Sequence, residues 1–235
     1  EFLFKKNKVT YIKGKGVLFS KNDIVVYDNN KKTSYKTKNI VIATGSEVTS
    51  LPGIEIDEKN IISSTGALSL DKVPKKLAVI GGGYIGLEMG SVWSRLGSEV
   101  TVIEYLDFIT PGMDREISNE FKKILTKQGI KFNMGSKVVS VKNNGAKVLI
   151  NYKDIKNSED KTLEVDKVLV SVGRKPYTDG LNLAKVGVKK DNKGRIEVNE
   201  KLQTSVQNIY AIGDVIKGPM LAHKAEEEGI AVAEI

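Results

Sequence analysis

The strongest constraint on this chain is a run of glycines between a short apolar segment and a helical one. Gly81, Gly83 and Gly86 form the pattern G-x-G-x-x-G directly after the apolar residues 77–80. A short continuous apolar run is typical of a strand buried on both faces. The residues after the glycines predict a helix to about Leu96. The pattern therefore predicts a strand–turn–helix unit of a parallel α/β sheet.

Each glycine of this turn has a separate physical task. Gly81 permits the tight turn, Gly83 lets the backbone approach a pyrophosphate, and Gly86 lets the helix pack close to the sheet. The unpaired N–H groups of the first helical turn favour phosphate oxygens. Glu104 closes the next apolar run, residues 100–103. A carboxylate there can accept both ribose hydroxyls and would repel a 2′-phosphate, so the pattern favours NAD over NADP.

Other interpretations of these residues stay open on spacing alone. The turn could simply pack, with Glu104 in water, or it could belong to an S-adenosylmethionine site, although such sites usually lack the complete glycine triplet. Tyr84 could cover a nicotinamide ring or pack against the protein. Glu88 lies in the first helical turn, where the helix dipole favours a carboxylate without any further role.

The rest of the chain alternates between strand and helix patterns. An amphipathic helix is predicted at residues 114–128, with Ile117, Phe121, Ile124 and Leu125 on one face, and a final helix follows Pro219. Residues 54–75 are predicted as a polar connection. Apolar or β-rich runs predict strands at residues 9–12, 24–27, 32–36, 40–43, 100–103, 130–134, 138–141, 148–152, 163–165, 167–172 and 209–212.

The order of these elements predicts how the domains are arranged. The runs at 138–141, 148–152 and 163–165 are separated by polar turns, which favours an antiparallel meander beside the parallel sheet. Strand ends at Thr44-Gly45 and Gly213-Asp214 flank the central unit. We therefore expect one α/β domain inserted into another, with a boundary near residues 69–75.

Composition excludes several classes of protein. The chain has no Cys and one His, so it holds no disulfide, no thiolate zinc site and no His-rich metal centre. The sequence contains no run of about 18 apolar residues, so it predicts no membrane-spanning helix. The net charge is +8, but only four of the 37 basic residues are Arg and aromatic residues are 6 %, so we do not expect nucleic-acid binding.

Four further segments carry a resemblance to a known family. They are I-V-I-A-T-G-S (40–46), V-G-R-K-P (172–176), I-Y-A-I-G-D (209–214) and M-L-A-H (220–223). Together with G-G-G-Y-I-G-L-E (81–88), they resemble the flavoprotein disulfide reductases with two dinucleotide-binding folds. Residues 63–70 and 218–229 are similar to the NAD-linked dihydrolipoamide dehydrogenases in particular. The resemblance covers essentially the whole chain but only about half of such an enzyme.

The resemblance implies a Rossmann-like NAD-binding domain inserted into part of a Rossmann-like FAD-binding domain. Residues 1–70 would be a partial FAD-binding domain, 71–180 the NAD-binding domain, and 181–235 the return to the FAD-binding domain. The implied NAD-binding positions are Gly81, Gly82, Gly83, Tyr84, Ile85, Gly86, Leu87, Glu88, Glu104, Val138 and Gly173. The implied FAD-binding positions are Gly16, Thr44, Gly45, Ser46, Asp214, Met220, Leu221, Ala222 and His223.

Some of these positions have more specific implied roles. In the family, Glu88 pairs with a Lys near the redox disulfide, and Tyr84 and Glu88 lie near nicotinamide and flavin. Asp214 follows a Gly at a strand end, where a carboxylate can accept hydroxyls of a ribityl chain or cap a helix. His223 would line the flavin pocket, because the catalytic His of the family lies further toward the C-terminus. No catalytic residue is expected in this sequence.

The implied activity is the oxidation of dihydrolipoamide, carried on a lipoyl domain of 2-oxo acid dehydrogenase complexes, with electrons passing through a cystine and FAD to NAD⁺. The cysteine pair, the first FAD glycine motif and the C-terminal interface domain have no counterpart here. Both ends look cut, so we expect an internal fragment that is inactive alone, from a homodimer of the mitochondrial matrix or bacterial cytoplasm. Another flavoprotein reductase of the same architecture, mercuric or NADH-dependent, and a non-catalytic NAD-binding module are the alternatives.

Overall fold

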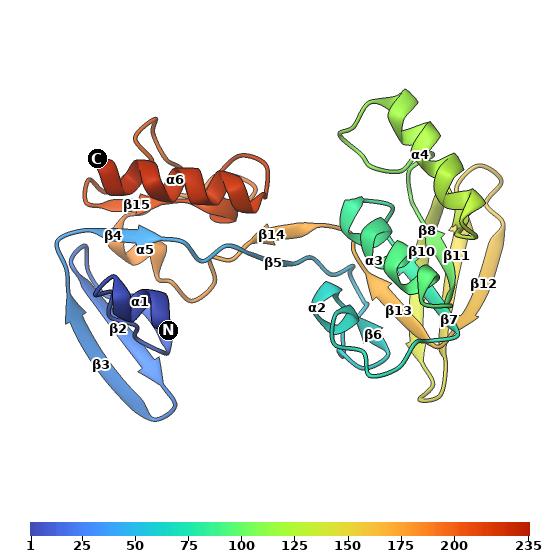
Figure 1. The fold of residues 1–235 in the computed structure, drawn as a ribbon, viewed down its shortest axis with the longest axis horizontal. Coiled ribbons are helices and arrows are strands. Elements are labelled where there is room, and N and C mark those ends of the chain that lie inside the picture. The colour runs from blue at the N-terminus through green and yellow to red at the C-terminus, as the bar shows by residue number, and fades with distance from the viewer. The chain divides into compact units, whose positions relative to one another are not determined.

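The computed structural model describes residues 1–235 and has a mixed α/β fold, as the sequence predicts (Figure 1). The chain divides into two compact units. One contains residues 1–47 and 175–235, and the other contains residues 48–174. The central unit is thus inserted in the sequence of the outer one.

A five-stranded parallel sheet forms the centre of the unit at 48–174, in the order β6-β13-β7-β8-β9. The strands next to β7 are β8, which follows it in sequence, and β13, which returns much later. Their bounds are Lys76–Ile80 (β7), Glu99–Ile103 (β8), Lys131–Asn133 (β9), Lys167–Val170 (β13) and Ile61–Ile62 (β6). The order in which strands are added to the sheet therefore reverses at β7: β8 and β9 lie on one side of it, and β13 lies on the other.

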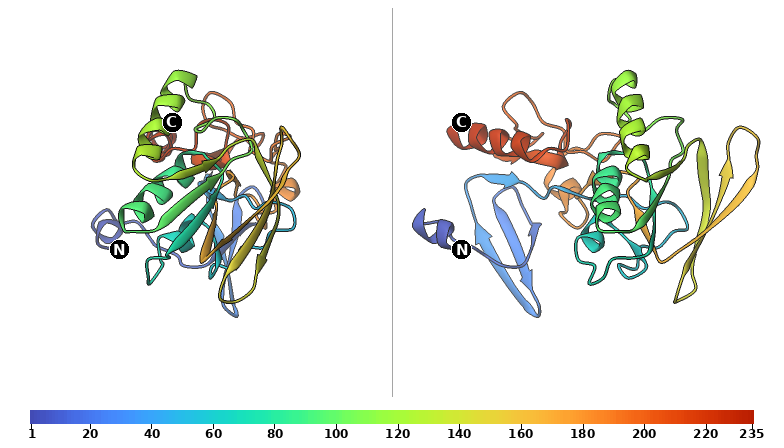
Figure 2. Two further views of the ribbon diagram at one scale, coloured as in Figure 1. Left: turned by 90° about the vertical axis from the view of Figure 1, so that its right-hand side faces the viewer. Right: turned by 45° about the vertical axis from the view of Figure 1, so that its right-hand side comes forward.

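Both faces of this sheet are covered (Figure 2). Val79 and Val102 point to the helical side, where they pack with Leu87 of α3 and Leu125 of α4. Ala78 and its neighbours of the opposite face pack against an antiparallel sheet. This burial on both sides explains the continuous apolar runs. The covering elements are α2 (Ser64–Ala67), α3 (Tyr84–Arg95), α4 (Arg115–Lys127) on one face and β10 (Ser136–Asn143), β11 (Val148–Asp154), β12 (Asp160–Val165) on the other.

The outer unit has an antiparallel three-stranded sheet and a parallel pair of strands. The parallel pair joins β4 to β15, so that Ile40 lies opposite Ile209. The core of the outer unit includes Leu18, Ile42 and Ile196. The elements are α1 (Phe2–Lys6), β1 (Lys15–Leu18), β2 (Asp23–Asp28), β3 (Lys31–Lys36), β4 (Ile40–Ile42), α5 (Leu183–Val186), β15 (Ile209–Ala211), the 3₁₀ turn η1 (Gly213–Val215) and α6 (Ala222–Glu234), while β5 (Ser46–Val48) pairs with β14 (Arg174–Pro176).

One predicted strand is absent, and two predicted elements form but are less buried than their apolar residues suggest. Residues 9–12 form no strand, because no other strand lies beside them, and Tyr11 is 60 % exposed. The strand at 40–43 is buried on one face only, since Val41 is exposed. On α4 only Leu125 of the four apolar residues is buried, whereas Ile117 and Ile124 are more than half exposed. Periodicity predicted these elements without showing which neighbours cover them.

The predicted polar connection at 54–75 also contains structure that the pattern did not show. Ile61 and Ile62 form β6 and pair with Val168 and Leu169 of β13. Ser63 caps α2 by accepting a hydrogen bond from the N–H of Thr65. Residues 48–70 therefore pack with the central unit, whereas the resemblance implies that they belong to the first segment. The sequence is thus divided between the two units at 47/48 and 174/175. The resemblance implies divisions at 70/71 and 180/181.

Candidate functional site

The glycine turn lies at the carboxyl end of β7, where the strand order of the parallel sheet reverses. Gly81 follows β7, and Ser171 follows the neighbouring strand β13. The Ser171 hydroxyl donates to the carbonyl oxygens of Ile80 and Gly81 at 3.0 and 3.3 Å. In open α/β sheets, ligands bind outside the carboxyl ends of the strands at such a reversal. The topology therefore makes this turn the candidate site of the central unit.

The three glycines of the turn occupy very different surroundings. Gly81 has φ +107°, and a Cβ there would meet the backbone of Ser171. A Cβ on Gly86 would collide with the carbonyl of Gly81 and with Val79, so this glycine sets the close approach of α3 to the sheet. Nothing lies within 4 Å of a Cβ built on Gly83. Two glycines thus serve the fold, and the third borders open space.

The backbone of the turn is tied to the protein on its inner side. Gly81 donates its N–H to the carbonyl of Ile103, and Gly82 donates its N–H to the carboxylate of Glu104. At the start of α3, the N–H groups of Gly83, Tyr84 and Ile85 have no partner within the chain. Unpaired N–H groups at a helix start carry partial positive charge. A diphosphate placed beside Gly83 would find hydrogen-bond donors there.

Glu104 lies at the carboxyl end of β8 and is 7 % exposed. Its two carboxylate oxygens accept hydrogen bonds from the N–H groups of Gly82 and Leu106, the latter at 2.7 Å. The carboxylate is therefore held beside the glycine turn. Each oxygen retains a further lone pair that can accept a ribose hydroxyl.

The other predicted positions of the central unit are less closely defined by contacts. Tyr84 and Glu88 are exposed on α3, and neither side chain has a partner within the chain. Gly173 is exposed with φ +127°, in the segment after β13. Val138 packs against the core between the two sheets. Ile85 is half-buried and Leu87 is fully buried, so Leu87 contributes packing of α3.

A second group of predicted positions meets in the outer unit. The hydroxyl of Ser46 donates to the carboxylate of Asp214 at 2.6 Å, across 168 residues of sequence. The hydroxyl of Thr44 donates to the carbonyl of Tyr177, and the carbonyl of Gly45 accepts the N–H of the same residue. Gly45 has φ +70°, with nothing within 4 Å of a built Cβ. The structure therefore brings together residues 44–46 and Asp214.

Asp214 is held in place through its neighbour. It lies within η1 and makes no capping bond, so the capping role considered for it is not observed. Gly213 donates its N–H to Glu228 at 2.7 Å, and Lys224 donates to the carbonyl of Gly213 at 3.5 Å. Lys224 and Glu228 themselves form a 2.7 Å ion pair, with each side chain less than a fifth exposed. This pair is not among the predicted site residues, although its four-residue spacing on a helix is visible in the sequence.

The remaining positions implied for this group lie on the surface of the outer unit. Leu221, Ala222 and His223 are exposed at the start of α6, Met220 is half-buried before it, and Gly16 is exposed on β1. None of these side chains forms a hydrogen bond or an ion pair with Asp214.

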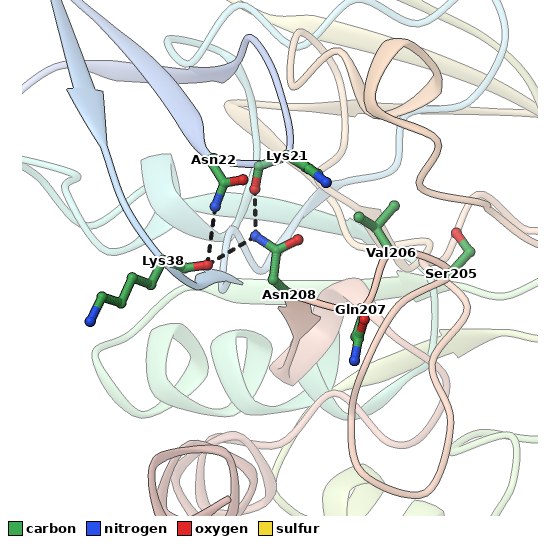
Figure 3. A pocket seen from close by; sticks show the side chains of 7 residues that line it. All are labelled: Lys21, Asn22, Lys38, Ser205, Val206, Gln207 and Asn208. Atoms are coloured by element: carbon green, nitrogen blue, oxygen red, sulfur yellow. Dashed lines mark hydrogen bonds between the residues drawn. The ribbon is translucent and has the colours of Figure 1, made fainter.

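A surface pocket of the outer unit lies elsewhere, lined by Lys21, Lys38 and residues 205–208 among others. The side-chain amides of Asn22 and Asn208 in this lining hold loops together. Asn208 donates to the carbonyls of Lys21 and Lys38, and Asn22 also donates to Lys38 (Figure 3). We therefore assign this pocket a structural role.

No group of His, Cys, Asp and Glu residues has the arrangement of a metal site. No helix has the length and apolar character needed to cross a membrane.

Comparison with known proteins identifies similar sequences and structures. The family model described as pyridine nucleotide-disulphide oxidoreductase matches residues 1–229. The chain is 57 % identical to "Dihydrolipoyl dehydrogenase, mitochondrial" of Pisum sativum over 235 residues, which is 100 % of the chain and 47 % of that protein. It is 58 % identical to "Dihydrolipoamide dehydrogenase" of Chaetomium thermophilum, again over 100 % of the chain and 47 % of the relative. The chain spans about half the length of the relatives it matches.

A solved structure has the same fold. It is the Cu(II) complex of the HOCl-induced flavoprotein disulfide reductase RclA from Escherichia coli, with a TM-score of 0.89 and 28 % identity. The match covers 99 % of this chain and 54 % of that one.

Proposed function

The chain belongs to the pyridine nucleotide-disulphide oxidoreductase family, and on that premise we propose that it is the NAD-binding portion, with part of the FAD site, of a dihydrolipoyl dehydrogenase. The reaction of the whole enzyme would be dihydrolipoamide + NAD⁺ to lipoamide + NADH + H⁺. The similarity of the whole chain to about half of proteins named dihydrolipoyl or dihydrolipoamide dehydrogenase supports this assignment.

The observation that carries the NAD assignment is the glycine turn with its open side. Gly83 borders free space, and the N–H groups at the start of α3 have no partner. These donors fit a diphosphate. Glu104 would accept the adenosine ribose hydroxyls, and its negative charge disfavours the additional phosphate of NADP. The residues present therefore fit NAD.

The FAD assignment is carried by Asp214 and residues 44–46. Asp214 is half-buried, and its carboxylate can accept ribityl hydroxyls while it holds Ser46. Gly45 leaves free space beside this pair. The chain holds a single G-x-G-x-x-G motif, so these residues fit only part of a flavin nucleotide. Bound flavin would supply the two-electron chemistry between the thiols and the nicotinamide.

The residues of this chain would bind and orient rather than exchange electrons. No Cys is present, so the cystine that oxidises dihydrolipoamide would come from outside this sequence. Glu88 is exposed without a partner and would pair with a Lys outside the chain, and Tyr84 beside it would lie near the nicotinamide. The lipoyl substrate and the 2-oxo acid dehydrogenase complex are the proposed partners, with a homodimer as the full assembly. Several relatives carry "mitochondrial" in their names, which favours the mitochondrial matrix.

A second function within the same architecture is supported by one observation. The fold matches RclA at a TM-score of 0.89, although RclA is a HOCl-induced flavoprotein disulfide reductase. A reductase with another substrate would keep the same nucleotide sites. The much higher identity to dihydrolipoyl dehydrogenases favours the first proposal.

Fluorescence titration of the 235-residue chain with NADH, NADPH and FAD tests the proposal. We expect saturable binding of NADH, weaker binding of NADPH, and little or no retention of FAD, because only part of the flavin site is present. The chain alone should show no lipoamide or diaphorase turnover. Equal affinity for NADH and NADPH, or no binding of either, would contradict the NAD assignment.

A further inference from the structure

The peptide between Gly82 and Gly83 is held from one side by a residue outside the glycine turn. The carbonyl of Gly82 accepts a 2.8 Å hydrogen bond from the N–H of Thr110. In a trans peptide the C=O and the following N–H point in opposite directions. The bond therefore aims the N–H of Gly83 away from Thr110. That N–H is one of the unpaired donors beside the open space at Gly83.

Thr110 makes this contact in an unfavourable backbone conformation. Its φ is +51°, in the left-handed region that β-branched residues rarely occupy. Such a conformation persists only where the surroundings hold it, and it is frequently found near functional sites. The neighbouring contacts must therefore fix Thr110.

Two contacts fix it. The Thr110 hydroxyl shares a 2.8 Å hydrogen bond with the hydroxyl of Ser118, which is fully buried on α4. Ile109, directly before Thr110, is also fully buried in the core under the helices. Asp114 caps α4 and so fixes the helix that carries Ser118. The start of α4 is thereby connected through Thr110 to the glycine turn.

We propose that Thr110 is a positioning residue for the diphosphate of the dinucleotide. It orients the Gly82–Gly83 peptide so that the Gly83 N–H is presented to a phosphate oxygen, and Ser118 holds Thr110 in the conformation required. The inference rests on the proposed NAD site. Thr110 acts through the turn and does not itself contact the ligand.

Three substitutions of Thr110 separate positioning from packing. Thr110→Val keeps the branched shape but loses the hydroxyl, so the left-handed conformation and the bond to Gly82 are weakened. Thr110→Ser keeps the hydroxyl. Thr110→Gly removes the whole side chain, yet glycine adopts a positive φ without strain and keeps the N–H.

The readout is the affinity of the 235-residue chain for NADH and for ADP-ribose, which contains the diphosphate but no nicotinamide. We expect Thr110→Val to weaken both about five- to tenfold, the effect of one poorly oriented hydrogen bond. Thr110→Ser and Thr110→Gly should stay within about twofold of the unchanged chain. Ser118→Ala should weaken binding in the same direction, and the double variant with Thr110→Val should be less than additive because the two residues form one contact.

A packing role predicts the opposite order, with Thr110→Gly the most impaired because it loses the most side chain. Affinity in Thr110→Val equal to that of the unchanged chain, or an equal loss in Thr110→Gly, would overturn the inference. Thr126→Val is the matched control, since that hydroxyl bonds only a carbonyl of its own helix. Circular dichroism shows whether each variant is folded. If Thr110→Val does not fold, the NADH affinities of Thr110→Ser and Ser118→Ala still test the inference.

The outcome also distinguishes this inference from the proposed function. If the unchanged chain binds neither NADH nor ADP-ribose, the NAD assignment fails and Thr110 has no ligand to position. If binding depends on Glu104 but is the same in Thr110→Val and Ser118→Ala, only the role of Thr110 is refuted.

Discussion

The carboxylate of Glu104 accepts a hydrogen bond from the N–H of Gly82, which precedes it by 22 residues. This contact joins the ends of β7 and β8 at the proposed dinucleotide site. It also places the carboxylate, 7 % exposed, beside the open side of the glycine turn. Glu104 therefore supports the fold of the turn and is positioned for a ribose at the same time.

Glu104→Ala should weaken NADH binding by about tenfold or more, because the ribose loses its acceptor. It should also lower the free energy of unfolding by about 1–3 kcal/mol, since the N–H groups of Gly82 and Leu106 lose their partner. NADH fluorescence titration and urea unfolding measure the two effects. Glu55→Ala, at an exposed position, is the control. Unchanged NADH affinity in Glu104→Ala would refute the ribose role.

Gly83→Ala and Gly86→Ala should have opposite effects. The methyl group at Gly83 meets nothing in the protein and φ is −77°, so stability should hardly change, while NADH affinity should fall by about tenfold or more as the methyl blocks the diphosphate. The methyl at Gly86 collides with Gly81 and Val79, so the unfolding free energy should fall by about 1–3 kcal/mol. Thermal unfolding and NADH titration of both variants provide the comparison. Normal NADH binding by Gly83→Ala would argue against a diphosphate at the turn.

Glu228→Ala should loosen α6 from the turn that carries Asp214. The substitution removes the carboxylate that accepts from the Gly213 N–H and pairs with the Lys224 ammonium, at a cost of about 1–3 kcal/mol. Hydrogen exchange should show faster exchange at the Gly213 amide and along α6. Glu227→Ala on the exposed side of the same helix should behave like the unchanged protein. Equal protection in the two variants would show that the ion pair does not hold the turn.

Acid should weaken the central unit through Asp57. Burial raises the pKa of Asp57, but hydrogen bonds from the backbone N–H groups of Lys59, Ile61 and Asn60 and from Asn143 together bring it below its usual range. A lowered pKa in the folded state adds stability that is complete above the ordinary value of about 4 and is lost as the pH falls through the folded value.

Asp57→Asn should therefore destabilise the chain at pH 7, and the difference from the unchanged protein should shrink below about pH 4. Urea unfolding at pH 7, 4 and 3 measures this difference. Asp71→Asn, exposed and without hydrogen bonds, should show no such dependence. A constant difference between Asp57→Asn and the unchanged protein from pH 7 to 3 would count against this explanation.

The parts of the structure that the sequence predicted are those set by neighbouring residues. The buried run before Gly81 and the glycine spacing predicted β7, the turn and α3, and the polar segments between the apolar runs at 138–141, 148–152 and 163–165 predicted the β10–β12 meander. The glycine spacing and the continuous apolar runs involve neighbouring positions in the chain, so they can be read from the sequence. The acidic residue at the end of β8 was visible for the same reason.

Contacts between distant segments left no such pattern. Thr110 reaches Gly82, and Ser46 reaches Asp214 across 168 residues, only because sheet order brings their elements together. The same holds for α4, whose periodicity places Ile117 on the apolar face of the helix although its neighbours leave that side chain exposed. The sequence by itself determined the local units and the chemistry each can offer, because these depend on adjacent side chains. The tertiary structure alone decided which of them meet, because pairing and burial depend on residues that the chain brings together from far apart.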